Sequence, residues 1–147
     1  HTLRAVEQAT SLVGDQGALG VAYRGLKRKW LLHLALLLHD LGKGYVEDHS
    51  DVGLRIATEM APRLGLDEAD AETLKFLVHK HLMMSHLAFR RDTSDEQLIT
   101  KFAVDVGSAE TLQMLYVLTC CDTAAVGPGT LNAWKSEVLT DLYRRTR

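Results

Sequence analysis

The spacing of apolar residues limits this chain to one fold class. Apolar residues recur at every third and fourth position along nearly the whole sequence, whereas strand-like alternation is almost absent and β-branched and aromatic residues are scattered. Recurrence at three and four places apolar side chains on one face of an α-helix. We therefore predict an all-α bundle of about six to seven helices.

Glycines and capping residues mark where these helices begin and end. Thr93 and Glu96 have the spacing of a capping box, and the Gly-Pro-Gly segment at 127–129 ends one helix before Thr130 begins the last. The predicted helices span residues 1–13, 22–39, 50–64, 67–84, 94–106, 108–126 and 130–145.

Length and composition indicate a single domain spanning residues 1–147. Hydrophobic residues make up 46% of the chain and charged residues 24%, which is typical of a globular protein. The net charge of −2 provides no field that would attract nucleic acid or an anionic membrane. The longest apolar run, residues 31–38, is far shorter than the roughly 18 residues that a membrane span needs. We expect neither nucleic acid nor a membrane as partner.

The segment LLHLALLLHDLGKG, residues 31–44, is the first candidate for chemistry. An apolar helix ends there in His39 and Asp40, and glycines follow at once. At the last turn of a helix both side chains can bend toward one cation, and a carboxylate can also bridge two cations. A structural His–Asp pair near a helix end would have the same sequence, so the dipeptide alone leaves both interpretations open.

Asp122 favours the metal interpretation. It continues the apolar series Leu112, Leu115 and Leu118, so its carboxylate is predicted to face the core. Burying a carboxylate without a partner costs on the order of several kcal/mol, so a cation should lie nearby. An Arg or Lys neighbour is the alternative, but the surrounding segment YVLTCCDTAAVG contains no basic residue. A metal ion is the better explanation.

Two further histidines are candidate ligands. The apolar stripe of the fourth predicted helix leads to His81 and turns His79 outward, although a histidine that faces inward can also be an ordinary core residue. His49 lies on a predicted loop before the third helix. Arg90 and Arg91 follow the fourth helix and could bind a phosphate or a partner, or could be solvated.

Together these residues form the pattern H…HD…H…H…D, which resembles the HD superfamily of metal-dependent phosphohydrolases. More narrowly, the chain is similar to the HD domain of the bifunctional uridylyltransferase/uridylyl-removing enzymes of bacterial nitrogen regulation. Four segments carry this resemblance: HDLGKGYVEDHSDVG at 39–53, HLMMSHLAFRRD at 81–92, TCCDTAAVGP at 119–128 and NAWKSEVLTDLYRRT at 132–146.

The resemblance implies a fold, a reaction and a set of site residues. The fold is an HD-domain bundle around a buried metal site, and the reaction is hydrolysis of a phosphodiester that removes UMP from a uridylylated tyrosine of the PII signal-transduction protein. Residues in three roles carry over: metal ligands His1, His39, Asp40 and Asp122, with His49 and His81 for a second ion; catalytic residues Asp40 and Lys43; and substrate-binding residues Lys43, Arg90, Arg91 and Lys135.

Some of these assignments have alternatives or departures. Lys43 and the basic pair at 90–91 could be solvated, and Trp134 is predicted to anchor the core rather than to stack on a base. The chain departs from the family at 45–47, where Tyr-Val-Glu replaces a more usual Arg-Gly-Gly, and at 123–125, where an arginine is common. One or two divalent ions are expected, Mn or Mg first, with Fe, Co or Zn possible.

The sequence is also compatible with two other functions. The first is an HD phosphohydrolase for a free nucleotide, and the second is a regulatory HD module that binds nucleotide without turnover. Because His1 already belongs to the site, we expect further domains of the same enzyme. The adjacent Cys120 and Cys121 form no CxxC or disulfide framework and no signal peptide opens the chain, so a cytoplasmic location is predicted.

Overall fold

The computed structural model describes residues 2–41, 49–90, 95–127 and 129–147, without the side chains of His49, Ser50 and Arg90. Every regular element in these ranges is helical, which confirms the all-α prediction. None of these helices is long and apolar enough to cross a membrane. The elements are α1 (Thr2–Ser11), the 3-10 turn η1 (Leu12–Gly14), α2 (Ala18–Arg24), α3 (Lys29–Leu38), α4 (His49–Arg63), α5 (Glu68–His79), α6 (Met83–Arg90), α7 (Glu96–Val106), α8 (Ala109–Ala125) and α9 (Ala133–Thr146).

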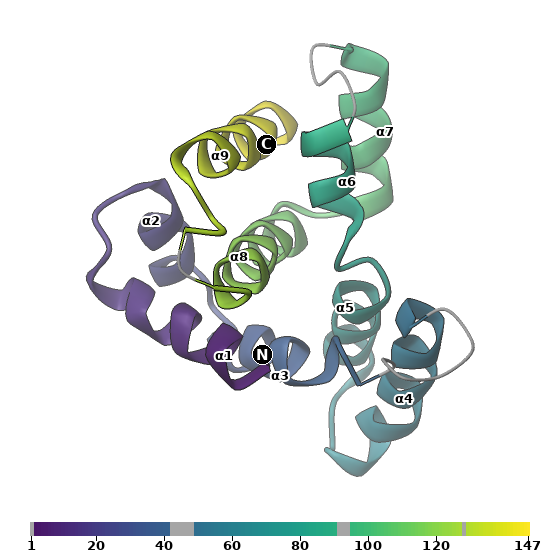
Figure 1. The fold of residues 1–147 in the computed structure, drawn as a ribbon. Coiled ribbons are helices and arrows are strands. Elements are labelled where there is room, and N and C mark those ends of the chain that lie inside the picture. Colours follow the sequence, from purple (N-terminus) through teal and green to yellow (C-terminus); the bar gives the residue numbers. More distant parts are fainter. Residues whose placement is uncertain (1, 42–48, 91–94, 128) are drawn as a thin grey trace.

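Helix α8 is the centre of the fold (Figure 1). Helices α1, α2, α3, α5, α6, α7 and α9 pack around it, and α4 packs along the outer side of α5. Residues on every side of α8, from Leu112 to Cys121, are buried. A helix that is apolar on all sides is stable only inside a core. The sequence of α8 therefore fixes its central place, and its C-terminal end carries Asp122 into the interior.

Two of the predicted long helices are each divided into two. The segment predicted as 22–39 breaks after Arg24, and α3 begins at Lys29. The segment predicted as 67–84 ends at His79, and a turn at residues 80–82 separates α5 from α6. These breaks raise the number of α-helices in the described ranges to nine. Thr130 does not cap the last helix, because the side chain of Asn132 accepts the hydrogen bond from the Lys135 amide.

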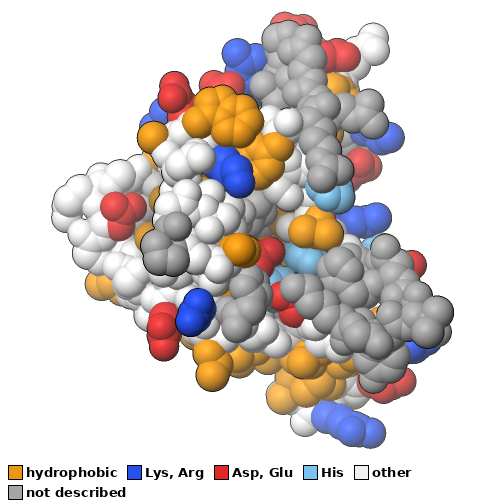
Figure 2. Space-filling model, viewed as in Figure 1, with side chains coloured by type: hydrophobic (Ala, Val, Ile, Leu, Met, Phe, Trp, Pro, Cys, Tyr) orange, Lys and Arg blue, Asp and Glu red, His pale blue; other side chains and the backbone are white. Residues whose placement is uncertain are grey.

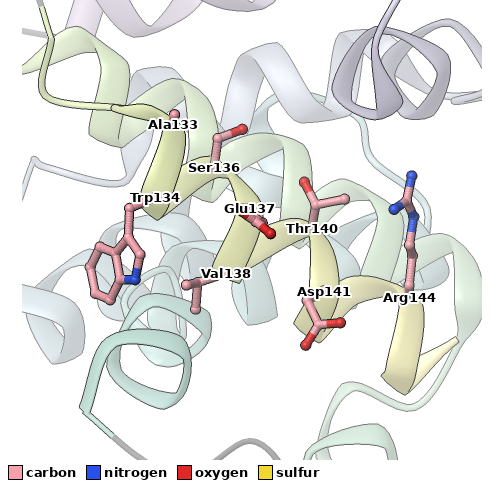
Figure 3. A pocket seen from close by; sticks show the side chains of 8 residues that line it. All are labelled: Ala133, Trp134, Ser136, Glu137, Val138, Thr140, Asp141 and Arg144. Carbon is pink, nitrogen blue, oxygen red and sulfur yellow. The ribbon is translucent and has the colours of Figure 1, made fainter.

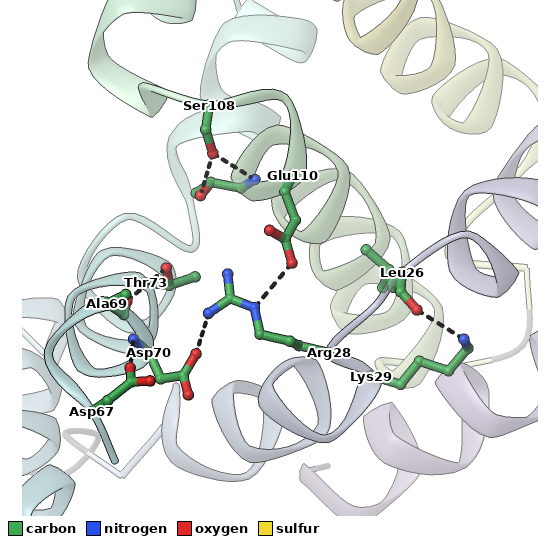
Figure 4. A network of polar contacts seen from close by, with 10 residues as sticks. Leu26, Arg28, Lys29, Asp67, Ala69, Asp70, Thr73, Ser108 and Glu110 are labelled. Carbon is green, nitrogen blue, oxygen red and sulfur yellow. Dashed lines mark hydrogen bonds and ion pairs between the residues drawn. The ribbon is translucent and has the colours of Figure 1, made fainter.

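Arg28, the residue just before α3, links this helix to two others (Figure 4). Its guanidinium Nε donates a hydrogen bond to Glu110 Oε1 at 2.9 Å, and its Nη1 donates to the carboxylate of Asp70. Glu110 lies in the first turn of α8 and Asp70 in the first turn of α5. One guanidinium therefore links the starts of three helices and forms ion pairs with two carboxylates.

We expect the substitution Arg28→Ala to lower the free energy of unfolding by about 1–3 kcal/mol, because it leaves two half-buried carboxylates without their shared cation. Urea unfolding followed by circular dichroism would measure the change. Arg145→Ala is the matched control, since its ion pair with Asp141 is about half exposed on both sides and should contribute about 0.5 kcal/mol or less. Equal losses in the two variants would contradict a bridging role for Arg28.

Candidate metal centre

His39 lies at the end of α3, with its imidazole fully buried. Its Nδ1 is 2.6 Å from the carbonyl oxygen of Leu36, so Nδ1 carries the hydrogen that it donates to this acceptor. The other ring nitrogen, Nε2, lies 3.1 Å from Asp122 Oδ1 and 3.2 Å from Asp40 Oδ2. A backbone acceptor at one ring nitrogen fixes the orientation of the ring. It also favours the tautomer with the hydrogen on Nδ1, which leaves Nε2 able to bind a metal.

His81 is held in the same way in the turn between α5 and α6. Its Nδ1 lies 2.7 Å from the carbonyl oxygen of Val78, and its ring is 2% exposed. Its Nε2 lies 3.9 Å from Asp40 Oδ1, and its ring meets that of His39 edge-on with centroids 5.0 Å apart. Asp40 therefore directs one carboxylate oxygen toward each of the two imidazoles.

These side chains come from three segments that are distant in the sequence. His39 and Asp40 follow α3, His81 follows α5, and Asp122 lies near the end of α8. The side chains of Asp40 and Asp122 are 11% and 19% exposed, so the cluster is largely enclosed. In Figure 2, histidine and acidic side chains gather near the middle of the face shown.

The donor atoms fit a divalent cation. One ligand atom from each of His39, Asp40 and Asp122 lies within 4.8 Å of the others. Imidazole nitrogens mixed with carboxylate oxygens are ligands that Mn, Fe, Co and Zn accept. The described part of the chain therefore has a cluster that could hold a metal ion.

The electrostatics of the cluster favour a positive charge at this point. Burial opposes protonation of His39, but hydrogen bonds to Asp122 and Asp40 outweigh it and raise its pKa to about 9. Burial lowers the pKa of His81, which favours the neutral imidazole. Two carboxylates thus stabilise the protonated, positively charged imidazole of His39, and a divalent ion would provide the same positive charge.

Comparison with known proteins identifies the family. The profile of the HD domain matches residues 1–114. The chain belongs to the HD domain family. Three relatives are each named bifunctional uridylyltransferase/uridylyl-removing enzyme and are 48% identical to it. They come from Ruegeria pomeroyi, matched over 88% of this chain, and from Cereibacter sphaeroides and Bordetella bronchiseptica, each matched over 83%. This HD domain spans only 13–14% of the length of these relatives.

The remaining predicted site residues fall in two groups. His1, Lys43 and Arg91 lie outside the described residues, as do the side chains of His49 and Arg90. The structure therefore brings together four of the six predicted ligands of the HD domain and leaves the assignment of His1 and His49 as a prediction. His79, expected to face away, pairs with Asp51 at 2.9 Å and takes no part in the cluster.

Lys135 and Trp134 lie at the contact between α6 and α9. Lys135 Nζ is 5.7 Å from the centre of the Phe89 ring, and Trp134 stacks on the same ring. Trp134 is 58% exposed, so the prediction that it anchors the core is wrong. Figure 3 shows it at one end of a groove of about 700 Å³ along α9, whose lining residues are Ala133, Trp134, Ser136, Glu137, Val138, Thr140, Asp141 and Arg144. This groove contains none of the clustered residues of the HD domain.

The sequence did not predict two backbone groups that orient the histidines of the cluster. They are the backbone carbonyls of Leu36 and Val78, each of which accepts the Nδ1 hydrogen of the histidine three residues later. A signal for them exists in the sequence, because each histidine lies three residues after an apolar residue in the last turn of a helix. The spacing alone did not reveal that both segments turn there and direct the Nε2 atoms of His39 and His81 toward Asp40.

Proposed function

We propose that this HD domain is a metal-dependent phosphodiesterase that removes UMP from a uridylylated tyrosine of the PII protein. The observation that carries the proposal is the 48% identity, over 130 residues, to a relative whose name includes the uridylyl-removing activity. The cluster of His39, Asp40 and Asp122 supports the metal-dependent part. PII as partner follows from the resemblance of the sequence segments to that enzyme family.

The residues of the cluster suit this reaction. His39 Nε2, Asp40 and Asp122 would hold one divalent ion, and His81 Nε2, near the other oxygen of Asp40, would contribute to a second. Bound divalent ions supply Lewis-acid charge that offsets the negative phosphoryl oxygens and makes water nucleophilic near neutral pH. The buried imidazoles and their backbone acceptors keep the donor atoms in place without rearrangement, which is how an enclosed site lowers the cost of reaching the transition state.

The departing group reduces what else the protein must provide. Hydrolysis of the phosphodiester adds water to phosphorus, breaks the bond to the tyrosine oxygen and releases UMP and the free tyrosine side chain. A tyrosine oxygen has an ordinary pKa near 10, so it leaves more readily than an alkoxide would. The proposed reaction therefore needs no strong general acid, and most clustered side chains can serve as ligands.

We expect the purified chain to release UMP from uridylylated PII, and more slowly from a small aryl ester of UMP, in a reaction that manganese restores after chelation abolishes it. Chromatographic detection of UMP measures both rates, and metal analysis of the dialysed protein gives the ions bound. Free deoxynucleotides and guanosine tetraphosphate are the comparison substrates. Rapid hydrolysis of a free nucleotide with no action on either UMP ester would replace the proposed substrate and leave the metal site intact.

A further inference from the structure

Gly53 lies where the backbone of α4 closely approaches α5 and the end of α3. It is buried on the face of α4 that packs against α5. A Cβ atom at Gly53 would lie 2.9 Å from Val78 Cγ1 and 3.7 Å from the carbonyl oxygen of His39. The backbone of α4 at this point therefore approaches both segments that carry the buried histidines of the cluster.

The atom that a Cβ would meet has little freedom to move. Val78 is fully buried, and its branched side chain has one strongly preferred rotamer in a helix. Its carbonyl oxygen accepts the hydrogen bond from His81 Nδ1 at 2.7 Å. A displacement of the Val78 backbone by a neighbour on α4 would move the acceptor that orients the His81 ring.

We propose that Gly53 is a positioning residue of the metal centre. Without a side chain at this position, α4 can lie against Val78 while the Val78 carbonyl keeps His81 Nε2 directed toward Asp40. The inference rests on the proposed metal-binding role of the cluster. It assigns Gly53 no contact with substrate or ion, because its effect reaches the site through Val78 and His81.

The test compares four variants of the chain, one of which is Val78→Ala alone, the reference for the double variant. Gly53→Ala adds the Cβ, Gly14→Ala adds one where no atom lies within 4 Å, and Gly53→Ala/Val78→Ala removes the atom that the new Cβ would meet. Manganese affinity is measured by titration calorimetry, and the His81 imidazole is observed by nitrogen NMR in metal-free protein. We expect Gly53→Ala to weaken binding by about 10-fold or more, the scale of losses when groups that orient ligands are altered, and to shift the His81 resonances.

The controls separate positioning from general packing. Alanine favours a helix interior more than glycine does, so a weaker helix cannot account for lost affinity. Gly14→Ala should bind as the unmodified chain does, and the double variant should recover the affinity and His81 resonances of Val78→Ala alone. Unchanged His81 resonances in Gly53→Ala, or a double variant as weak as Gly53→Ala, would overturn the proposal, as would a Gly53→Ala chain that no longer folds.

Failure of this inference and failure of the proposed function give different results. If the unmodified chain binds no divalent ion, the metal-dependent function fails. The NMR comparison in metal-free protein still decides whether Gly53 positions His81, because it needs no ion.

Discussion

Replacing Asp40 by alanine is expected to remove bound metal and to lower uridylyl-removing activity on the order of 10³-fold or more. Asp40 presents one oxygen to His39 and the other toward His81, so it lies close to both candidate ligand histidines. Metal analysis and the UMP-release assay on the same preparation would test the two losses together.

The same substitution should leave the fold intact. It removes one of two carboxylates that lie within 3.2 Å of the same imidazole nitrogen, so the free energy of unfolding should stay equal or rise. Asp105→Ala, which removes an exposed carboxylate from α7, is the matched control and should keep full activity. Full activity in Asp40→Ala would rule out the mechanism proposed here.

The second large effect is expected at His81. Substitution by asparagine retains a side-chain donor for the Val78 carbonyl but removes the nitrogen that faces Asp40. If His81 binds a second ion, metal content should fall from two ions to one, and activity should fall on the order of 10²-fold or more. Metal content by atomic emission and turnover on uridylylated PII are the measurements.

His79→Asn provides a close control for His81→Asn, because His79 is only two residues away and pairs with Asp51 outside the cluster. Its metal content and activity should not change. His49→Ala is expected to resemble His81→Asn. Two ions retained in both variants, or never more than one in the unmodified chain, would exclude a dinuclear centre. These histidines would then be candidates for proton transfer or phosphate contact.

The sequence predicted the all-α class and its main helices because apolar spacing reports helical periodicity directly. It did not predict the breaks at 25–28 and 80–82. The break at 25–28 is accompanied by a contact over a long distance in the sequence, that of Arg28 with Glu110, 82 residues away. Asp122 contacts the buried His39, as expected for a residue that faces inward, but the apolar series on which this prediction rested is weak evidence for it. Residues on all sides of α8 are buried, so the series from Leu112 does not by itself select that face.

The sequence alone determined the types of the candidate ligands, the end of the helix before His39 and Asp40, and the family pattern. Only the tertiary structure decided that Asp122 Oδ1 lies 3.1 Å from His39 Nε2, that Val78 and Leu36 orient the two imidazoles, and that Trp134 is exposed. The reason is physical. Periodicity fixes which face of a helix is apolar, but where a helix ends and which helix it meets depends on packing between segments far apart in the chain.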